Sequence, residues 1–502
     1  MHWDILLNPK RFRDKSTVVK SPSDNRSPFK KDFDTVCNST ILRRLQDKAQ
    51  VFPLEQEDYA RTRLTHSIEV MSIAESLGFQ VVDAIYKMDP KNTYFNKDED
   101  AKKKTDTLIN GIPYILKTAA LLHDMGNPPF GHLGERIIGD WFKNNLDKLV
   151  FDSEKKLVFN VGGETKESLA YLLKGERAKD LENFDGNAQL FRLVTKLSLV
   201  VDEFGMNLSF PVMATFIKYP TSSININDSR KINKKLGYFS SEKDKYAEIQ
   251  RTLGLESNGS PCRHPLVYLL EAADDIAYLT ADLEDAHKKG LLTIDKIIDY
   301  LSNQSDDSIV RKILDAITQY TKQAKEMNYQ DVEGYVIHRI RVLIKGYMID
   351  SINQAFEKNY YKIMDGDFDN ELISVSTSKC IASILRTIEN ENIYYCAPIL
   401  KNKTRANAVL TKLLETFVTA AVNWNKDIDA NSDSSNNLIY LSLSTNYKFI
   451  CESENQRISE HNPLSDNDKE NLLYNKILLA TDQISGMTDR HALSIYKMLT
   501  AN

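Results

Sequence analysis

The stretch Thr118–Arg136, TAALLHDMGNPPFGHLGER, decides how the rest of the chain is organised. Its apolar run of alanines and leucines predicts the end of a buried helix, and that helix delivers an adjacent pair, His123 and Asp124. The glycines and prolines of 126–131 break the helix, because proline lacks an N–H donor and glycine relaxes the backbone. A neutral imidazole and a carboxylate side by side at a helix end suit a divalent metal that takes nitrogen and oxygen ligands.

Two more polar residues, His132 and Glu135, follow on what the sequence predicts to be a new helix start. A lone His-Asp pair is more often a buried hydrogen bond before a turn than a metal site. The metal hypothesis therefore depends on whether further His and Asp residues come from other apolar helices.

The segment 61–70, RTRLTHSIEV, supplies the first of them, His66. Leu64 and Ile68 keep helical spacing, and Arg63 lies three residues before His66, so both polar side chains share one face. A single His on a helix is more often a packed or exposed imidazole. An arginine one turn before it, with the His-Asp pair later in the chain, favours a site that holds metal and phosphate together.

A second apolar helix, predicted from 265 to 278, carries Asp274 and Asp275 next to each other. Adjacent carboxylates inside such a helix are costly to bury without partners. Asp274, Tyr278 and Asp282 recur every four residues along one stripe, which a core helix does not normally show. A bound cation or a sugar hydroxyl would explain these acids.

Composition limits the class of protein. At 502 residues the chain can form one large helical domain or two or three smaller ones, and its net charge of -5 argues against a general nucleic-acid or membrane coat. Five cysteines without CxxC spacing argue against a disulfide framework or a thiolate zinc site. Because the sequence shows no apolar signal and no long uncharged span, we expect a reducing, cytoplasmic setting.

The spacing of apolar residues is helical along most of the chain, so we expect an all-α fold. We expect a polar arm over 1–31 and a catalytic core over 32–290 with polar insertions at 91–106 and 221–259. A helical C-terminal region over 291–502 would follow.

Seven stretches occur in one order along nearly the whole chain: RRLQDKAQVFPLE (43–55), RTRLTHSIEV (61–70), LLHDMGNPPFGHLGE (121–135), FDGNAQ (184–189), KYP (218–220), HPLVYLLEAADDIAY (264–278) and DQISGMTDRHA (482–492). Together they resemble the bacterial deoxyguanosine triphosphate triphosphohydrolases, which belong to the HD superfamily of metal-dependent phosphohydrolases. An HD dipeptide alone is a weak signal, whereas seven ordered stretches are a strong one. The resemblance implies an HD-type helical core, completed by the C-terminal region at the nucleotide site and at oligomer contacts.

The resemblance also implies a site for Mg²⁺ or Mn²⁺ with four ligands: His66, His123, Asp124 and Asp274. Asp274 is preferred over Asp275 because HD proteins place the last ligand directly after Ala in this helix. His132 and Glu135 match the catalytic histidine of the family and its acidic partner.

The substrate-binding residues that the resemblance implies are Gln50, Arg63, Asn127, Lys218, Tyr219, Tyr278 and Asp282. Arg63 and Asn127 match phosphate contacts, and the Lys-Tyr pair lies near the phosphates and the sugar. Gln50, Tyr278 and Asp282 match positions that line the deoxyribose and test for the missing 2'-hydroxyl. Ala49 departs from the family pattern, in which Thr is commoner beside the Gln, and this change touches nothing central.

These residue types fit the hydrolysis of dGTP to deoxyguanosine and inorganic triphosphate. The triphosphate leaves in one piece only if water attacks the α-phosphorus and the 5'-oxygen departs. His132 is the candidate donor of the proton that this oxygen needs. The pattern GxxxxGK[ST] is absent from the sequence, so cleavage between the β- and γ-phosphates by a P-loop is not supported.

Two alternatives stay open. The chain could be another HD phosphohydrolase, acting on nucleoside monophosphates or a cyclic dinucleotide, although the long C-terminal half and the Tyr278–Asp282 pair speak against this. It could also be a regulator that responds to nucleotides or single-stranded DNA. Basic residues of 339–345 could bind such DNA, although charges of this kind are more often a solvated face. The resemblance implies a homo-oligomer, specifically a hexamer.

Overall fold

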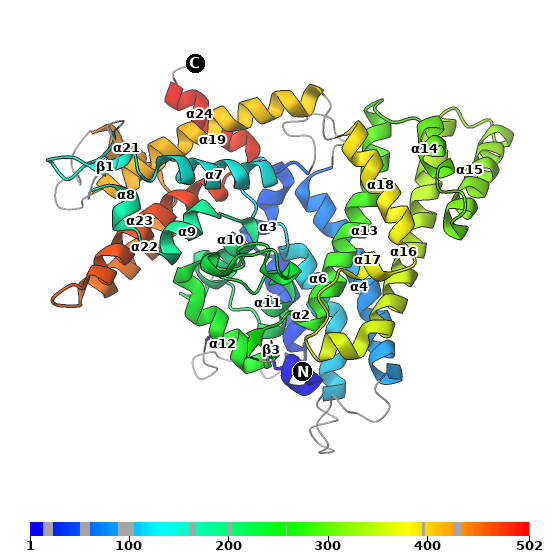
Figure 1. The fold of residues 1–502 in the computed structure, drawn as a ribbon, viewed down its shortest axis with the longest axis horizontal. Helices are drawn as coiled ribbons and strands as arrows, with labels where there is room; N and C mark the ends of the chain where they lie inside the picture. The colour runs from blue at the N-terminus through cyan, green and yellow to red at the C-terminus, as the bar shows by residue number, and fades with distance from the viewer. Residues whose placement is uncertain are drawn as a thin grey trace.

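The computed structural model describes residues 1–13, 24–50, 61–88, 105–160, 167–198, 203–257, 259–393, 397–424 and 434–500. In these ranges nearly all regular structure is helical (Figure 1). Two small antiparallel sheets pair β1 (Leu149–Phe151) with β2 (Leu157–Phe159) and β3 (Glu256–Ser257) with β4 (Ser260–Pro261). The predicted all-α class is confirmed.

Three helices form the centre of the molecule: α4 (Arg63–Met88), α6 (Ile112–Leu122) and α13 (Pro265–Lys288). Helix α4 packs against both of the others, and α6 is apolar on nearly every side, so it is buried all round. Helix α13 begins at a proline, which is favourable at the first helical position, and His264 caps it by accepting from the backbone N–H of Leu266. These helices carry the polar residues that the sequence analysis selected.

Two groups of helices flank this centre. On one side, α16 (Val332–Met364) and α18 (Lys379–Asn392) pack against α13, and α14 (Ile294–Ser302) and α15 (Ser308–Glu326) lie beyond them at one end of the long axis (Figure 1). On the other side, α19 (Ala397–Asn423) packs on α7 (His132–Asn145), α23 (Asp466–Ser485) and α24 (Asp489–Thr500). The remaining α-helices are α2 (Pro28–Cys37), α3 (Thr40–Arg44), α8 (Leu169–Leu172), α9 (Glu176–Glu182), α10 (Gly186–Arg192), α11 (Phe210–Phe216), α12 (Lys243–Leu253), α17 (Leu372–Val375), α21 (Ser435–Ser442) and α22 (Thr445–Ser459).

Within the predicted polar arm, 1–31, the described residues include a short buried helix. Helix α1 (Trp3–Leu6) buries Trp3 completely, and the indole Nε1 of Trp3 donates to the hydroxyl of Tyr360 at 2.8 Å. Trp3, Leu6 and Leu7 keep helical spacing, so one face of this short segment is apolar enough to join the core. Residues 14–23 lie outside the described ranges, and α2 begins before the predicted arm ends.

The two predicted insertions, 91–106 and 221–259, are only partly covered by the described residues. The insertion at 221–259 contains helix α12, and most of the insertion at 91–106 lies outside the described residues. The division into arm, core and C-terminal region stays a prediction. Of the helices that the structure describes, none combines the length and the apolar character that crossing a bilayer requires.

Two arginines of the basic segment 339–345 of α16 contact other residues of the chain. Arg341 forms ion pairs with Glu69 and Glu284, and the guanidinium of Arg339 lies 4.7 Å from the ring centroid of Tyr320. The charges of these two arginines therefore serve contacts within the chain.

Candidate active site

Three predicted ligands converge from three helices. His66 comes from the first turns of α4, His123 from the end of α6 and Asp274 from the middle of α13. The Oδ1 atom of Asp274 lies 3.0 Å from Nε2 of His66 and 3.5 Å from Nε2 of His123. One ligand atom from each residue lies within 4.8 Å of the others, which is the geometry of a potential metal site.

This cluster fits a divalent cation. Nδ1 of His123 lies 2.6 Å from the carbonyl oxygen of Ala120, which fixes the ring and leaves Nε2 facing the cluster. In the described part of the chain, this buried Nε2 has no hydrogen-bond partner. Burial alone would lower the pKa of His123, but the carboxylates of Asp124 and Asp274 raise it to about 9. The charges that hold a proton on this ring are equally suited to a metal ion.

The fourth predicted ligand, Asp124, lies beside this cluster. Its Oδ2 atom is 3.7 Å from Nε2 of His123 and accepts a hydrogen bond from Nη1 of Arg63 at 2.7 Å. Its Oδ1 atom accepts from the side-chain amide of Asn127 at 2.5 Å. Two predicted phosphate-binding residues therefore orient the carboxylate of a predicted ligand.

The next acid in α13, Asp275, turns away from the histidines. Its Oδ2 atom lies 3.1 Å from Nη2 of Arg386, which belongs to α18. The choice of Asp274 as the ligand agrees with this geometry, because Asp275 already has a cationic partner from another helix.

A separate pair stands at the start of α7. Nδ1 of His132 lies 2.8 Å from Oε2 of Glu135, and Oε1 of Glu135 accepts from the backbone N–H of Gly186 at 3.0 Å. The imidazole is largely exposed, with 76% of its side-chain surface accessible, whereas Glu135 is buried. The hydrogen bond that Nδ1 of His132 donates to the carboxylate of Glu135 raises the pKa of His132. The predicted catalytic histidine is thus oriented and open to solvent.

Two glycines allow the site to close up. Gly131 has a φ of 60°, and a Cβ atom there would lie 2.2 Å from Nη2 of Arg63. A Cβ atom on Gly186 would lie 2.4 Å from Oδ1 of Asn127 and 2.6 Å from Oε1 of Glu135. Arg63, Asn127 and the His132–Glu135 pair therefore pack against one another only because these positions have no side chain.

The predicted Lys-Tyr pair lies beside α13. Nζ of Lys218 is 3.2 Å from Oε1 of Glu271, and the carbonyl oxygen of Lys218 accepts from Nε of Arg263. Tyr219 is buried, and its ring lies 5.7 Å from Nζ of Lys218. Glu271 is three residues before Asp274 in α13, so the lysine is held close to the part of α13 that carries this predicted ligand.

The predicted sugar-binding residues contain unsatisfied buried acceptors. Oε1 of Gln50 and Oδ2 of Asp282 have no hydrogen-bond partner among the described residues. Burial raises the pKa of Asp282 to about 7, and burial also raises the pKa of the half-buried Tyr278. Such acceptors are costly unless a ligand supplies donors.

Several residues of this region were missed in the sequence analysis. Arg386 pairs with Asp275, and burial raises the pKa of Glu389, a buried acid near Asp282, to about 9. Both lie on α18, whose register against α13 no local pattern reveals. Lys48 is buried and donates to the carbonyl oxygens of Asn127 and Ser485.

A cation near the His132–Glu135 pair was also missed. Nζ of Lys235 lies 3.3 Å from Oδ2 of Asp185, and the charge of Glu135 helps to raise the pKa of Lys235. This lysine is half-exposed and comes from the polar segment 221–259, which offered no motif.

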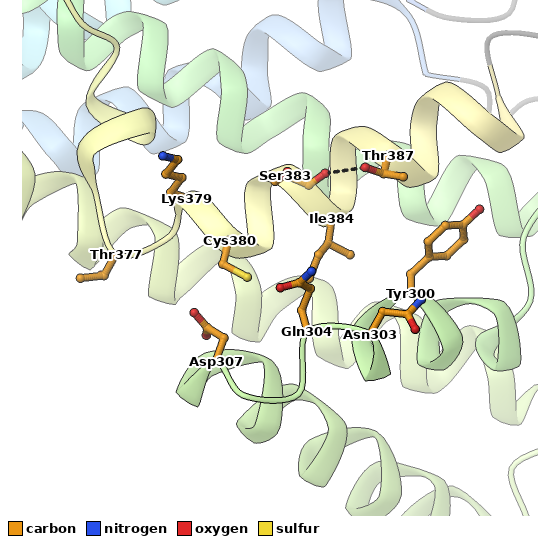
Figure 2. A pocket seen from close by; sticks show the side chains of 10 residues that line it. All are labelled: Tyr300, Asn303, Gln304, Asp307, Thr377, Lys379, Cys380, Ser383, Ile384 and Thr387. Carbon is orange, nitrogen blue, oxygen red and sulfur yellow. Dashed lines mark hydrogen bonds between the residues drawn. The ribbon is translucent and has the colours of Figure 1, made fainter.

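A cavity of about 580 Å³ lies between α18 and the turn that joins α14 to α15 (Figure 2). Cys380, Ser383 and Ile384 of α18 line it together with Gln304 and Asp307 of the turn between α14 and α15. No predicted site residue lines this cavity, and Arg386 of the same helix pairs with α13 instead. The candidate active site is therefore assigned by its chemistry and not by cavity size.

Comparison with known proteins gives a family. The chain is 36% identical over 501 residues to a "Deoxyguanosinetriphosphate triphosphohydrolase-like protein" of Listeria monocytogenes, with 99% of both chains covered. It is 30% identical to a protein of the same name from Synechocystis, again over 99% of both chains. It is 27% identical to the "Deoxyguanosinetriphosphate triphosphohydrolase" of Yersinia enterocolitica, with 94% of both chains covered. No protein-family model matches the sequence. On the strength of full-length relatives at 30% identity and above, the chain belongs to the deoxyguanosine triphosphate triphosphohydrolase family.

Proposed function

We propose that the protein hydrolyses dGTP to deoxyguanosine and inorganic triphosphate. The observation that carries this proposal is the convergence of His66, His123 and Asp274 into a metal-type cluster, with a separate, oriented His132–Glu135 pair nearby in the sequence. The names of the relatives add the substrate class, since they describe triphosphohydrolases of dGTP or proteins like them.

The proposed metal is Mg²⁺ or Mn²⁺, held by His66, His123 and Asp274 with Asp124 beside them. When bound, such an ion polarises phosphoryl oxygens and lowers the pKa of water. Arg63 has the double task of orienting Asp124 and offering its planar guanidinium to the phosphates.

The reaction breaks the bond between the α-phosphorus and the 5'-oxygen. The oxygen of a water molecule forms a new bond to that phosphorus, and this water gives up one proton to solvent. The α-, β- and γ-phosphates stay joined to one another and leave as inorganic triphosphate. The 5'-oxygen becomes the hydroxyl of deoxyguanosine and needs a proton, for which His132 is the proposed donor. Because Glu135 raises the pKa of His132, it favours the protonated ring that this step needs.

The remaining residues would bind the nucleotide on either side of the reacting phosphorus. Lys218, and with it Lys235, would neutralise phosphate charge, while Asn127 would help to fix the phosphates. Tyr219 would lie against the sugar. Gln50, Tyr278 and Asp282 would line the deoxyribose, where the unsatisfied acceptors of Gln50 and Asp282 can bind the 3'-hydroxyl.

The test is incubation of the purified protein with each of the four dNTPs and with GTP, in Mg²⁺ or Mn²⁺. Products are separated by ion exchange. Deoxyguanosine and triphosphate in equal amounts from dGTP, with slower turnover of the other nucleotides, would support the proposal. Pyrophosphate or single phosphate as the first product would refute attack at the α-phosphorus.

A further inference from the structure

Two contacts hold α4 and the residues just before it against α13. One is the approach of His66 to Asp274, and the other joins Nη1 of Arg61 to Oδ1 of Asp285 at 2.5 Å. Arg61 comes before His66 in the chain, whereas its partner Asp285 comes after Asp274, the partner of His66. The two helices therefore run antiparallel and are held at two points.

The second contact belongs to a larger cluster of charges, which we call the two-arginine clamp: Arg61, Arg341, Glu69, Glu284 and Asp285. Arg61 donates to both carboxylate oxygens of Glu69, at 3.1 Å each. Arg341 of α16 pairs with Glu69 at 2.7 Å and with Glu284 at 2.5 Å. Three helices thus meet in one network of planar, multiply bonded guanidinium groups.

The clamp is shielded from water. Only 11% of the side-chain surface of each arginine is exposed, and Asp285 is 12% exposed. Surface ion pairs contribute little, but a shielded pair is costly to break, because one charge is left without its partner. The clamp therefore resists sliding of α4 along α13.

The span between the two fixed points carries the proposed sugar-binding residues. Eleven residues separate Asp274 from Asp285, about 16 Å along a helix axis. Tyr278 and Asp282 lie within this span. Nη1 of Arg61 also reaches the carbonyl oxygen of Ala281 at 3.4 Å, one residue before Asp282.

The start of α4 is also joined to the segment that carries Gln50. The backbone N–H of Arg63 donates to the carbonyl oxygen of Lys48 at 2.9 Å, and Ala49 pairs with Thr62 in a β-bridge. Arg61 is thus adjacent in the chain to the junction that places Gln50, and bonded to the part of α13 that places Asp282.

We propose that Arg61 is a positioning residue for sugar selection. It sets the spacing between the Gln50 segment and the Tyr278–Asp282 face of α13, and through this spacing the preference for deoxyribose over ribose. This inference rests on the proposed function. Lysine cannot replace it, because one ammonium group cannot bond to Glu69 and Asp285 with the geometry of the fork.

Two variants test the inference, Arg61→Lys and Asp285→Asn, with Lys87→Ala as the matched control. Lys87 also links α4 to α16, through Glu357, but at the far and exposed end of α4. Each protein is assayed with dGTP and GTP, and its metal content is measured. We expect KM for dGTP to rise about 10-fold in the two clamp variants, and the ratio of kcat/KM for dGTP over GTP to fall by a similar factor. The metal content and kcat should stay within about twofold of the wild type, because no metal ligand touches Arg61.

The control variant Lys87→Ala should change neither the KM for dGTP nor the ratio of kcat/KM for dGTP over GTP. An unchanged dGTP/GTP ratio in both clamp variants would overturn the inference, as would an equal change in Lys87→Ala. The wild-type assay tests the proposed function separately, since it precedes any comparison between variants.

A second measurement needs no turnover. Amide hydrogen exchange of segment 277–285 should be faster in Arg61→Lys than in the wild type by about 10-fold, as expected for local opening. The segment in Lys87→Ala should exchange at the wild-type rate. Equal exchange in all three proteins would show that the clamp does not hold this part of α13.

Discussion

Oδ1 of Asp274 lies 3.0 Å from Nε2 of His66, although 208 residues separate the two in the chain. The three potential metal ligands of this cluster, His66, His123 and Asp274, each come from a different helix. The cluster is made only when α4 and α13 pack together, and His123 joins it from α6. Packing of three apolar helices is therefore the condition for the proposed chemistry.

The metal site leads to the first prediction. His66→Ala, His123→Ala and Asp274→Ala should each lose bound metal and activity, because each removes one donor from a small set. Asp124→Ala should lose metal too, if the fourth proposed ligand is correct. Metal analysis of the purified proteins measures this. Asp275→Asn is the control, since Asp275 pairs with Arg386. If Asp275→Asn loses the metal while Asp274→Ala keeps it, the ligand in α13 is Asp275 and not Asp274.

The second prediction separates binding from chemistry. His132→Ala should keep its metal and bind dGTP, yet its kcat should fall by about 10²–10⁴-fold, the usual contribution of a general acid. Glu135→Gln should show a smaller fall and a displaced pH profile, because it weakens the group that orients the ring. Rapid-quench measurement of product formation decides this. A kcat near the wild-type value in His132→Ala would remove His132 from the mechanism.

Sugar selection gives the third prediction. Tyr278 lies one turn beyond Asp274 in α13, so we expect its ring to lie beside whatever the metal site holds. Tyr278→Ala should narrow the gap between dGTP and GTP in kcat/KM and also slow dGTP turnover. Tyr278→Phe keeps the ring and should keep the gap. If the ratio stays the same in Tyr278→Ala, the tyrosine is only part of the packing.

A buried ion pair far from the surface gives the fourth prediction. Arg192 and Asp482 are joined by bonds of 2.8 to 3.0 Å, and both side chains are almost fully shielded. Asp482→Ala leaves the arginine without its main partner, and the free energy of unfolding should fall by about 3–5 kcal/mol. Urea denaturation measures the change. Lys156→Ala, at an exposed pair, is the control and should lie within about 0.5 kcal/mol of the wild type.

The fifth prediction concerns the pH dependence of stability. Asp180 is fully buried and accepts from the hydroxyl of Tyr474 and the N–H of Ser240, and burial raises its pKa from 3.8 to about 6. The folded state therefore favours the protonated acid, and Asp180 destabilises it as the pH rises from about 4 to about 6. Asp180→Asn removes this cost.

The stability of Asp180→Asn relative to the wild type should increase between pH 4 and 6 and then stay constant. Thermal denaturation of both proteins over this range gives the difference. A difference that does not change with pH would show that the pKa of Asp180 is the same in the folded and the unfolded state.

Short-range features of the site could be predicted from the sequence. Adjacency alone places His123 beside Asp124, and one helical turn places His132 near Glu135. The all-α class followed from apolar periodicity in the same way. These features need only the geometry of a single helix, which the local chain specifies.

The predicted polar arm, 1–31, has a buried start that the sequence analysis did not predict. Counting its charged residues hid the three apolar residues Trp3, Leu6 and Leu7, whose partners lie in helices hundreds of residues away. The positions of Arg386 and Glu389 beside α13 were missed because α18 shows only an ordinary amphipathic pattern. Charge and polarity along the chain do not reveal which distant helix a face will meet.

The sequence by itself determined the residue types of the site and the helices that carry them. Only the tertiary structure decided which of two adjacent aspartates faces the histidines, that Asp124 is held by Arg63 and Asn127, and that Arg61 joins α4 to α13. The physical reason is that a helix repeat fixes directions around one axis, whereas the distance and register between helices come from packing side chains across an interface.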